Sequence, residues 1–189
     1  VREEIEELLT EYIEKKLGGS GDKSPRFTIL FARLKQTATV LVLHIAKEFA
    51  QSEFEPAAFE LSIGREGDLP PLELRLPGGE TVSVEGKVDR VDVLRRGDES
   101  YVRVVDYKTG TKDFKLSDVL YGLNMQMLIY LAAIWQNGQP MFGNVKPAGV
   151  LYMPANRPSV SLDRGAPPEK VELEAQKKLR MNGLVLDDP

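Results

Sequence analysis

The sequence contains no cysteine among its 189 residues. Disulfide bonds, thiolate metal sites and cysteine-ligated iron–sulfur clusters are therefore excluded within this chain. Such a composition is typical of a reducing compartment, and we expect a cytoplasmic location. Histidine is almost as scarce, because His44 is the only one. It follows the apolar stripe of an expected helix, where a lone histidine more often packs or faces solvent than binds a metal.

Long hydrophobic runs are also lacking. The longest apolar stretches, 40–45 and 125–134, are too short or too polar to span a bilayer. The first residues are acidic and helix-forming, which does not fit a secretory signal. We therefore expect no membrane partner.

The chain lacks the excess of positive charge that is typical of nucleic-acid-binding proteins, since its formal net charge is −4. Net charge alone decides little, because a protein that holds cations with clustered carboxylates also has a negative balance. One stretch is locally rich in basic side chains: Arg90, Arg95, Arg96, Arg103, Lys108, Lys112 and Lys115. They are expected either to contact phosphates or to belong to an ordinary mixed-charge surface, and charge alone favours the surface.

The hydrophobic periodicity changes along the chain and predicts a mixed α/β domain, with a central mixed sheet flanked by helices. Helices are predicted over 2–17, 25–51, 117–136 and 168–180. The second should bury a stripe that includes Leu30 and Leu34, and Ser117 is the expected N-cap of the third. Alternating residues predict strands over 57–63, 71–76, 80–94 and 101–108, and an apolar run predicts another over 147–153.

The most informative stretches are GKVDRVD, residues 86–92, and VVDYKTG, residues 104–110. If the intervening hairpin turn is centred between Gly97 and Asp98, Asp89 lies opposite Asp106, with β-carbons roughly 5 Å apart. Two like charges in such a pair destabilise a sheet, and a divalent cation between them reverses that cost. The spacing therefore predicts a metal site.

Lys108 strengthens this hypothesis. Side chains alternate along a strand, so Asp106 and Lys108 share a face while Tyr107 points away. An ammonium group at that place can orient or help deprotonate an attacking water, and it neutralises charge that develops on a phosphate. The alternative is a surface strand pair with an Asp–Lys ion pair, because D-x-K alone is very common.

The stretches GKVDRVD, VVDYKTG and YGLNMQMLIYL, in this order, resemble the RecB-type branch of the PD-(D/E)XK nuclease superfamily. The resemblance is closest to the AddB type, the B subunits of bacterial helicase–nucleases, and it covers most of residues 50–189. It implies a restriction-endonuclease-like core and a Mg²⁺-dependent DNA exonuclease, with Mn²⁺ as a substitute. It also implies that an AddA-type helicase subunit delivers a DNA strand or duplex end, during double-strand-break repair.

The resemblance assigns roles to individual residues. It implies these catalytic residues: Asp89, Asp106, Lys108, Gln126 and Tyr130. It implies that Asp89 and Asp106 also bind the metal, together with the backbone carbonyl of Tyr107. Gln126 and Tyr130 match a Q-x-x-x-Y motif one helical turn apart, although alone they would be ordinary helix residues. Glu60, in the stretch FELSIG, is a further acidic candidate for the metal.

Two departures from the family bear on these expectations. Relatives carry a metal-ligand histidine upstream, and the surroundings of His44, VLVLHIAKEF, do not match its motif. Relatives of the AddB type also carry four cysteines for an iron–sulfur cluster, none of which is present. We therefore expect part of a longer parent, with the cluster and the histidine outside this chain.

The expected organisation is one domain over 1–189, with N-terminal helices in 1–52, the nuclease core in 53–155 and a C-terminal extension in 156–189. Two alternatives to an active exonuclease remain open. One is a nuclease-fold module that supports structure or guides DNA without cutting it. The other is a stand-alone RecB-like exonuclease.

Overall fold

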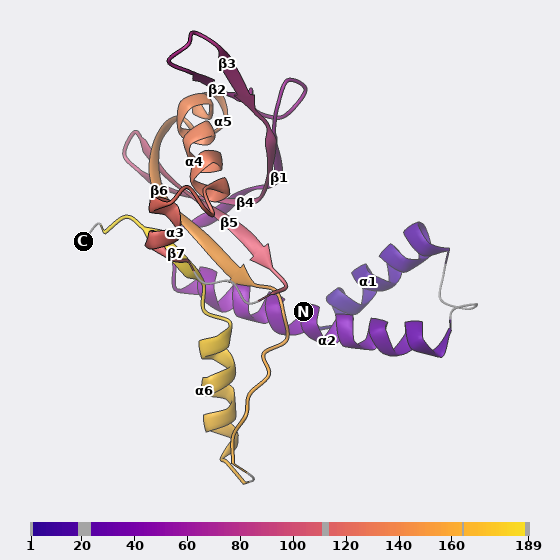
Figure 1. The fold of residues 1–189 in the computed structure, drawn as a ribbon. Helices are drawn as coiled ribbons and strands as arrows, with labels where there is room; N and C mark the ends of the chain where they lie inside the picture. Colours follow the sequence, from indigo (N-terminus) through magenta and orange to yellow (C-terminus); the bar gives the residue numbers. More distant parts are fainter. Residues whose placement is uncertain (1, 19–23, 111–113, 164, 188–189) are drawn as a thin grey trace. The chain divides into compact units, whose positions relative to one another are not determined.

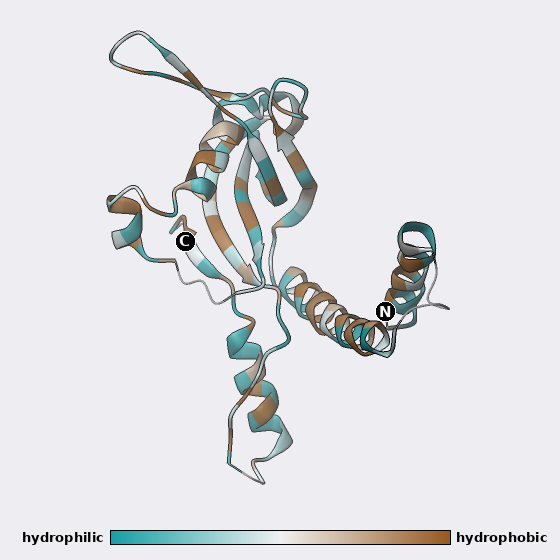
Figure 2. Ribbon diagram, turned by 45° about the vertical axis from the view of Figure 1, so that its right-hand side comes forward, coloured by the Kyte–Doolittle hydropathy of each residue, from teal (hydrophilic) through white to brown (hydrophobic). Residues whose placement is uncertain are grey.

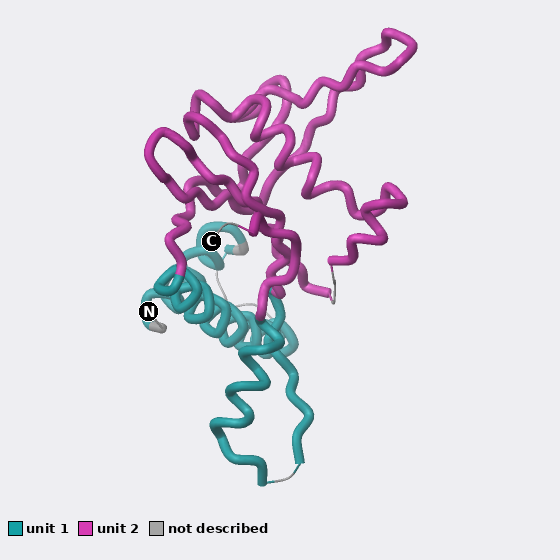
Figure 3. The backbone as a smooth tube through the Cα atoms, turned by 90° about the vertical axis from the view of Figure 1, so that its left-hand side faces the viewer, with its two compact units in different colours: residues 1–51, 155–179 teal, residues 52–154, 180–189 magenta. Residues whose placement is uncertain are grey.

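The computed structural model describes residues 2–18, 24–110, 114–163 and 165–187 (Figure 1). The chain divides into two compact units (Figure 3). The first comprises Val1–Gln51 with Ala155–Leu179, and the second comprises Ser52–Pro154 with Arg180–Pro189. All the residues predicted to carry chemistry belong to the second unit.

The first unit is helical, with α1 over Arg2–Leu17, α2 over Pro25–Ala50 and α6 over Pro168–Lys178. These bounds confirm the helices predicted there. At the start of α2, the N–H of Phe27 donates to the Ser24 side chain at 3.3 Å, and Pro25 occupies the first turn.

The buried stripe predicted for α2 comprised Leu30, Leu34, Leu41 and Ile45, and it is wrong for the first two, which are each 53% exposed, whereas Leu41 and Ile45 are half-buried. Apolar residues occur along most of this helix (Figure 2). Helical spacing predicts which side chains share a face of a helix, but it does not predict whether another element packs on that face. Among the described helices, α2 alone has the length and composition to cross a membrane. That is weak evidence, since the core helix of a soluble protein passes the same test.

The second unit contains a five-stranded sheet in the order β1-β4-β5-β6-β7. The strands are β1 Glu55–Ile63, β4 Gly86–Arg96, β5 Glu99–Lys108, β6 Asn144–Pro154 and β7 Asn182–Val185. Neighbours are antiparallel except β5 and β6, which are parallel. The predicted strand over 80–94 is two strands, because β3, Thr81–Val84, pairs with β2, Leu72–Arg75, in a separate ribbon.

A helical crossover joins the parallel strands β5 and β6, as such a pair requires. It contains α3 over Leu116–Leu120, α4 over Gln126–Asn137 and α5 over Gln139–Phe142. The single helix predicted over 117–136 is therefore wrong, and the N-cap of α3 is Lys115, not Ser117. The break has a local cause, because Gly122 and Asn124 adopt φ of 74° and 55°, outside the helical range.

Helix α4 packs on one face of the sheet, against β4, β5 and β6 (Figure 1). Its buried side chains join those of the two central antiparallel strands in one hydrophobic cluster: Val91, Val93, Val102, Val104, Met127, Leu131 and Ile134. We call this side of β4 and β5 the core face. The arrangement confirms the predicted mixed α/β core with a central mixed sheet and helices.

Candidate active site

The β4–β5 hairpin sets the positions of the predicted metal ligands. Its pairs run from Arg96 with Glu99 to Arg90 with Val105, so the turn is Gly97–Asp98, as predicted. Gly97 adopts φ of 61°, which glycine tolerates at no steric cost. The register fixes which side chains of β4 face which side chains of β5.

Regular pairing ends at the level of Asp89. Val88 and Val91 both belong to the hydrophobic cluster, although strict alternation would place them on opposite faces. The neighbouring strand is also irregular there, because Glu60 has φ of 53° while Phe59 pairs with Arg90. Irregularities of this kind bend strands and re-aim side chains, and they are frequent beside active sites.

At this irregular position, Asp89 uses its side chain to reach the neighbouring strand. The backbone N–H of Tyr107 donates to Asp89 Oδ2 at 2.8 Å. The register prediction is confirmed as far as Arg90 and Val105, and the contact of Asp89 is with the residue that follows Asp106. The Asp89 carboxylate is thus fixed at the end of β5.

Asp106 and Lys108 lie together on the core face, as predicted for D-x-K. Asp106 is 7% exposed, and the Lys108 ammonium forms an ion pair with its Oδ2. The same ammonium lies 5.8 Å from the ring centroid of Tyr152, which pairs with Asp106 on β6. Burial, followed by the nearby Asp106 charge, raises the pKa of the Tyr152 phenol, so this group stays neutral at physiological pH.

The Q-x-x-x-Y motif is brought to the start of β4. Gln126 Nε2 donates to Tyr130 Oη at 3.0 Å, and a β-carbon added at Gly86 would lie 2.5 Å from the Tyr130 ring. A side chain at position 86 would therefore force the Tyr130 ring to move, because the tyrosine packs directly on this backbone. Sequence reasoning did not single out Gly86, although a glycine at the start of a strand can signal such a close approach.

Glu60 is engaged by a neighbouring lysine. Its Oε2 lies 2.6 Å from Lys87 Nζ, and both side chains are more than half exposed. The hydrogen bond to Glu60 is the main cause that raises the pKa of Lys87. A role of Glu60 in metal binding stays a prediction.

The basic stretch does not form one phosphate-binding surface. Arg90 and Arg103 both pair with Asp92, and Arg96 contacts Glu53 at 3.3 Å. Strand alternation directs Arg90 and Arg103 to the face opposite the core face, and Arg90, which is 2% exposed, fits neither phosphate contact nor an ordinary surface. Lys112 lies outside the described residues.

The two carboxylates at the open end of the β4–β5 hairpin, Asp89 and Asp106, are suitable ligands for Mg²⁺. This ion prefers oxygen ligands and is usually held by one or two carboxylates together with waters and substrate phosphates. Asp106 Oδ2 is buried and has the Lys108 ammonium beside it without hydrogen-bond geometry, so its carboxylate can also serve as an oxygen ligand of a cation. Within the described ranges, no three His, Asp or Glu side chains gather in metal-binding geometry. The site therefore fits a sparsely liganded Mg²⁺, not an all-protein cage.

Comparisons with known proteins agree with this geometry. The chain is 42% identical, over 98% of its length, to the B subunit of the ATP-dependent helicase/deoxyribonuclease of Acetivibrio thermocellus. It is 40% identical to the corresponding protein of Ruminiclostridium cellulolyticum over 97% of this chain, and 38% identical to that of a Thermoanaerobacter species over 99%. It spans only 16%, 16% and 17% of these relatives. Because the sequence model of the PD-(D/E)XK nuclease superfamily matches residues 1–184, the chain belongs to that superfamily.

Proposed function

We propose that this chain is the Mg²⁺-dependent exonuclease domain of a cytoplasmic helicase–nuclease complex. It hydrolyses phosphodiester bonds of single-stranded DNA and processes double-strand-break ends for recombinational repair. The superfamily and the helicase/deoxyribonuclease relatives support a deoxyribonuclease that works with a helicase. The observation that carries the proposal is local: Asp89 is fixed at Tyr107 N–H, beside the paired Asp106 and Lys108.

Each residue has a task that follows from its position. Asp89, Asp106 and the Tyr107 carbonyl are the oxygen ligands that hold Mg²⁺. When bound, this ion polarises the scissile phosphate and lowers the pKa of water. Lys108, held by Asp106, orients the attacking water and offsets negative charge on the phosphate. Gln126 and Tyr130 line the same end of β4 and position the DNA strand.

The test is a substitution in the full polypeptide, assayed together with its helicase partner. Lys108→Ala is expected to abolish degradation of an end-labelled DNA strand and to leave duplex unwinding intact. Lys146→Ala is the matched control, because Lys146 is a half-exposed lysine of the same sheet that pairs with Glu99, next to the hairpin turn. Normal degradation by the Lys108→Ala protein would overturn the proposal.

A second candidate is a nuclease-fold module that guides DNA without cutting it. The absence of a group of three acidic or histidine side chains among the described residues favours it. Calorimetric titration of the chain with Mn²⁺ separates the two candidates. The proposed nuclease binds Mn²⁺ at a site that Asp89→Ala removes, whereas a guiding module has no site to lose.

A further inference from the structure

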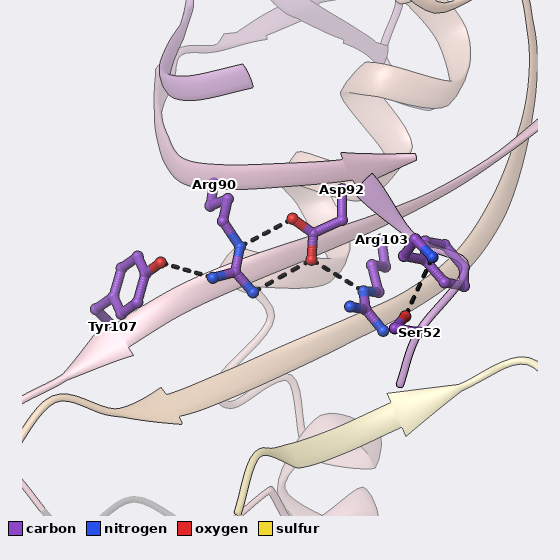
Figure 4. Close-up of polar contacts among 6 residues, drawn as sticks. Ser52, Arg90, Asp92, Arg103 and Tyr107 are labelled. Atoms are coloured by element: carbon purple, nitrogen blue, oxygen red, sulfur yellow. Dashed lines mark hydrogen bonds and ion pairs between the residues drawn. The ribbon is translucent and has the colours of Figure 1, made fainter. Parts of the chain in front are cut away.

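A closed group of charged side chains lies on the opposite face of the hairpin (Figure 4). Asp92 is fully buried, and its carboxylate contacts two guanidinium groups. Arg90 Nε lies 2.9 Å from Asp92 Oδ1, and Arg103 Nε donates to Asp92 Oδ2 at 3.0 Å. Arg90 is itself only 2% exposed. A buried charge persists only when it is paired, and here Asp92 Oδ2 accepts hydrogen bonds from both arginines while Asp92 Oδ1 contacts Arg90 Nε as an ion pair.

The group is anchored at its far end. The Arg103 guanidinium lies 4.3 Å from the ring centroid of Phe54, just before β1. The backbone N–H of Phe54 donates to Ser52 Oγ at 3.1 Å (Figure 4). Contacts of this kind restrict the rotamers of both arginines. The Arg90 side chain is therefore held by Asp92 at this end, and its Nη1 is directed toward Tyr107.

That other end reaches the candidate active site through one residue. Arg90 donates to Tyr107 Oη at 2.7 Å, and its guanidinium lies 5.5 Å from the Tyr107 ring centroid. The backbone of Tyr107 donates to Asp89 at 2.8 Å and separates Asp106 from Lys108. Tyr107 thus has its ring on one face of the sheet and its peptide group among the proposed metal ligands.

We propose that the buried group Arg90–Asp92–Arg103 is a positioning device for the metal site, acting through Tyr107. By holding the phenol, Arg90 fixes the backbone of Tyr107, whose N–H orders Asp89 and whose carbonyl would be offered to the ion. Partners that orient metal ligands in this way typically change metal affinity 10–100-fold, roughly, when they are lost. The inference rests on the proposed nuclease function, because it assumes that Asp89 and Asp106 bind a cation.

The test removes the hydroxyl group of Tyr107, in a protein that is otherwise unchanged. Tyr107→Phe keeps the ring and the backbone but loses the acceptor of the Arg90 hydrogen bond. Tyr101→Phe is the matched control, because Tyr101 is in the same strand and its hydroxyl donates to Glu99, far from the site. Two readouts are used, the Mn²⁺ dissociation constant by calorimetry and the hydrogen-exchange rate of the residue-107 amide by NMR.

For Tyr107→Phe we expect Mn²⁺ binding to weaken about tenfold. The residue-107 amide should exchange about fivefold faster, as befits a loosened hydrogen bond. The Tyr101→Phe chain should match the wild type in both readouts. A merely structural role would lower the melting temperature and leave both readouts unchanged at temperatures where the variant is folded, and that result would overturn the inference.

Asp106→Ala separates failure of this inference from failure of the proposed function. If Asp106→Ala abolishes Mn²⁺ binding but Tyr107→Phe binds like the wild type, the positioning role is wrong and the nuclease site stands. If the wild-type chain and Asp106→Ala give the same titration, the proposed metal site is wrong. In that case the amide exchange still decides whether Arg90 orders the peptide group.

Discussion

The two faces of the β4–β5 hairpin carry charge in opposite ways. On the far face, Asp92 is fully buried and is contacted by both Arg90 and Arg103. On the core face, Asp106 is nearly as buried, and its Oδ2 has the Lys108 ammonium beside it without hydrogen-bond geometry. Buried charge is costly, so both faces need compensation. Asp92 Oδ1 also lacks a partner of hydrogen-bond geometry, but Asp92 Oδ2 accepts hydrogen bonds from both arginines, so the far face supplies the fuller compensation.

This difference indicates which charges serve the fold and which serve chemistry. A carboxylate held by two guanidinium groups has little remaining capacity to bind an ion. A buried carboxylate with a single ammonium neighbour is compensated less fully, and it gains more from a cation and its waters. The core face therefore fits a site where stability is given up for function, and the far face supports it from behind.

The largest expected effect is a loss of DNA hydrolysis when a carboxylate of the core face is replaced. Asp106→Asn removes a proposed metal ligand and should lower DNA hydrolysis about a thousandfold or more, since metal ions supply several kcal/mol of transition-state stabilisation. The variant should melt at the same temperature as the wild type or higher, because a poorly compensated buried charge is gone. Hydrolysis rates and thermal melts measure the two effects. If the variant lost stability and kept its hydrolysis rate, Asp106 would serve the fold and not the chemistry, and the contrast between the faces would be wrong.

The converse substitution acts on the far face. Asp92→Ala leaves Arg90 and Arg103 without their shared partner and should cost about 3–5 kcal/mol of unfolding free energy, as broken buried pairs do. Urea unfolding measures this value, with Glu73→Ala as a control at an exposed strand position expected within about 0.5 kcal/mol of the wild type. A cost as small as that of the control would mean that the buried group is not structural.

A smaller effect is expected where α4 meets the core face. Gly86→Ala forces its new methyl group into the Tyr130 ring and should destabilise the chain by about 1–3 kcal/mol, as overpacking does. Gly78→Ala is the matched control, because nothing lies within 4 Å of a β-carbon there. Combining Gly86→Ala with Tyr130→Ala should recover part of the loss. Equal unfolding curves for the two glycine variants would show that Tyr130 does not pack on Gly86.

The smallest effect belongs to an exposed carboxylate outside both faces. Asp68 accepts hydrogen bonds from the Ser62 hydroxyl and the Ser62 backbone, and these lower its pKa. Because its folded pKa is depressed, its contribution is present above the unfolded pKa and is lost as pH falls through the folded pKa. Thermal melts from pH 6 to about pH 2.5 should therefore differ slightly between the wild type and Asp68→Asn, and the difference should vanish at the acid end. A difference that persists there would assign the effect to another group.

Local patterns predicted much of the fold and part of the site. Alternation and turn chemistry placed the hairpin turn at Gly97–Asp98 and put Asp106 and Lys108 on one face. The break between α3 and α4 escaped prediction, because the apolar residues around Gly122 continue the helical pattern through it. The contact of Asp89 with Tyr107 also escaped, since it depends on an irregularity shared with Glu60 in a strand far away in sequence.

The far-face group was hidden for the same reason. Read along the sequence, Arg90 and Arg103 resemble a basic patch, and only the cross-strand pairing of Asp92 with Arg103 reveals a buried pair. The sequence shows which charged residues are neighbours along the chain, whereas a buried charge is compensated by residues that are its neighbours in the folded structure.

The most direct test of the central claim is a crystal structure of the chain grown with Mn²⁺, with the ion located by its anomalous scattering. The contrast between the faces predicts an ion bound by Asp89, Asp106 and the Tyr107 carbonyl on the core face, with none at Asp92. A well-ordered hairpin with no ion at Asp89 and Asp106 under saturating Mn²⁺, or an ion bound at Asp92 instead, would contradict it.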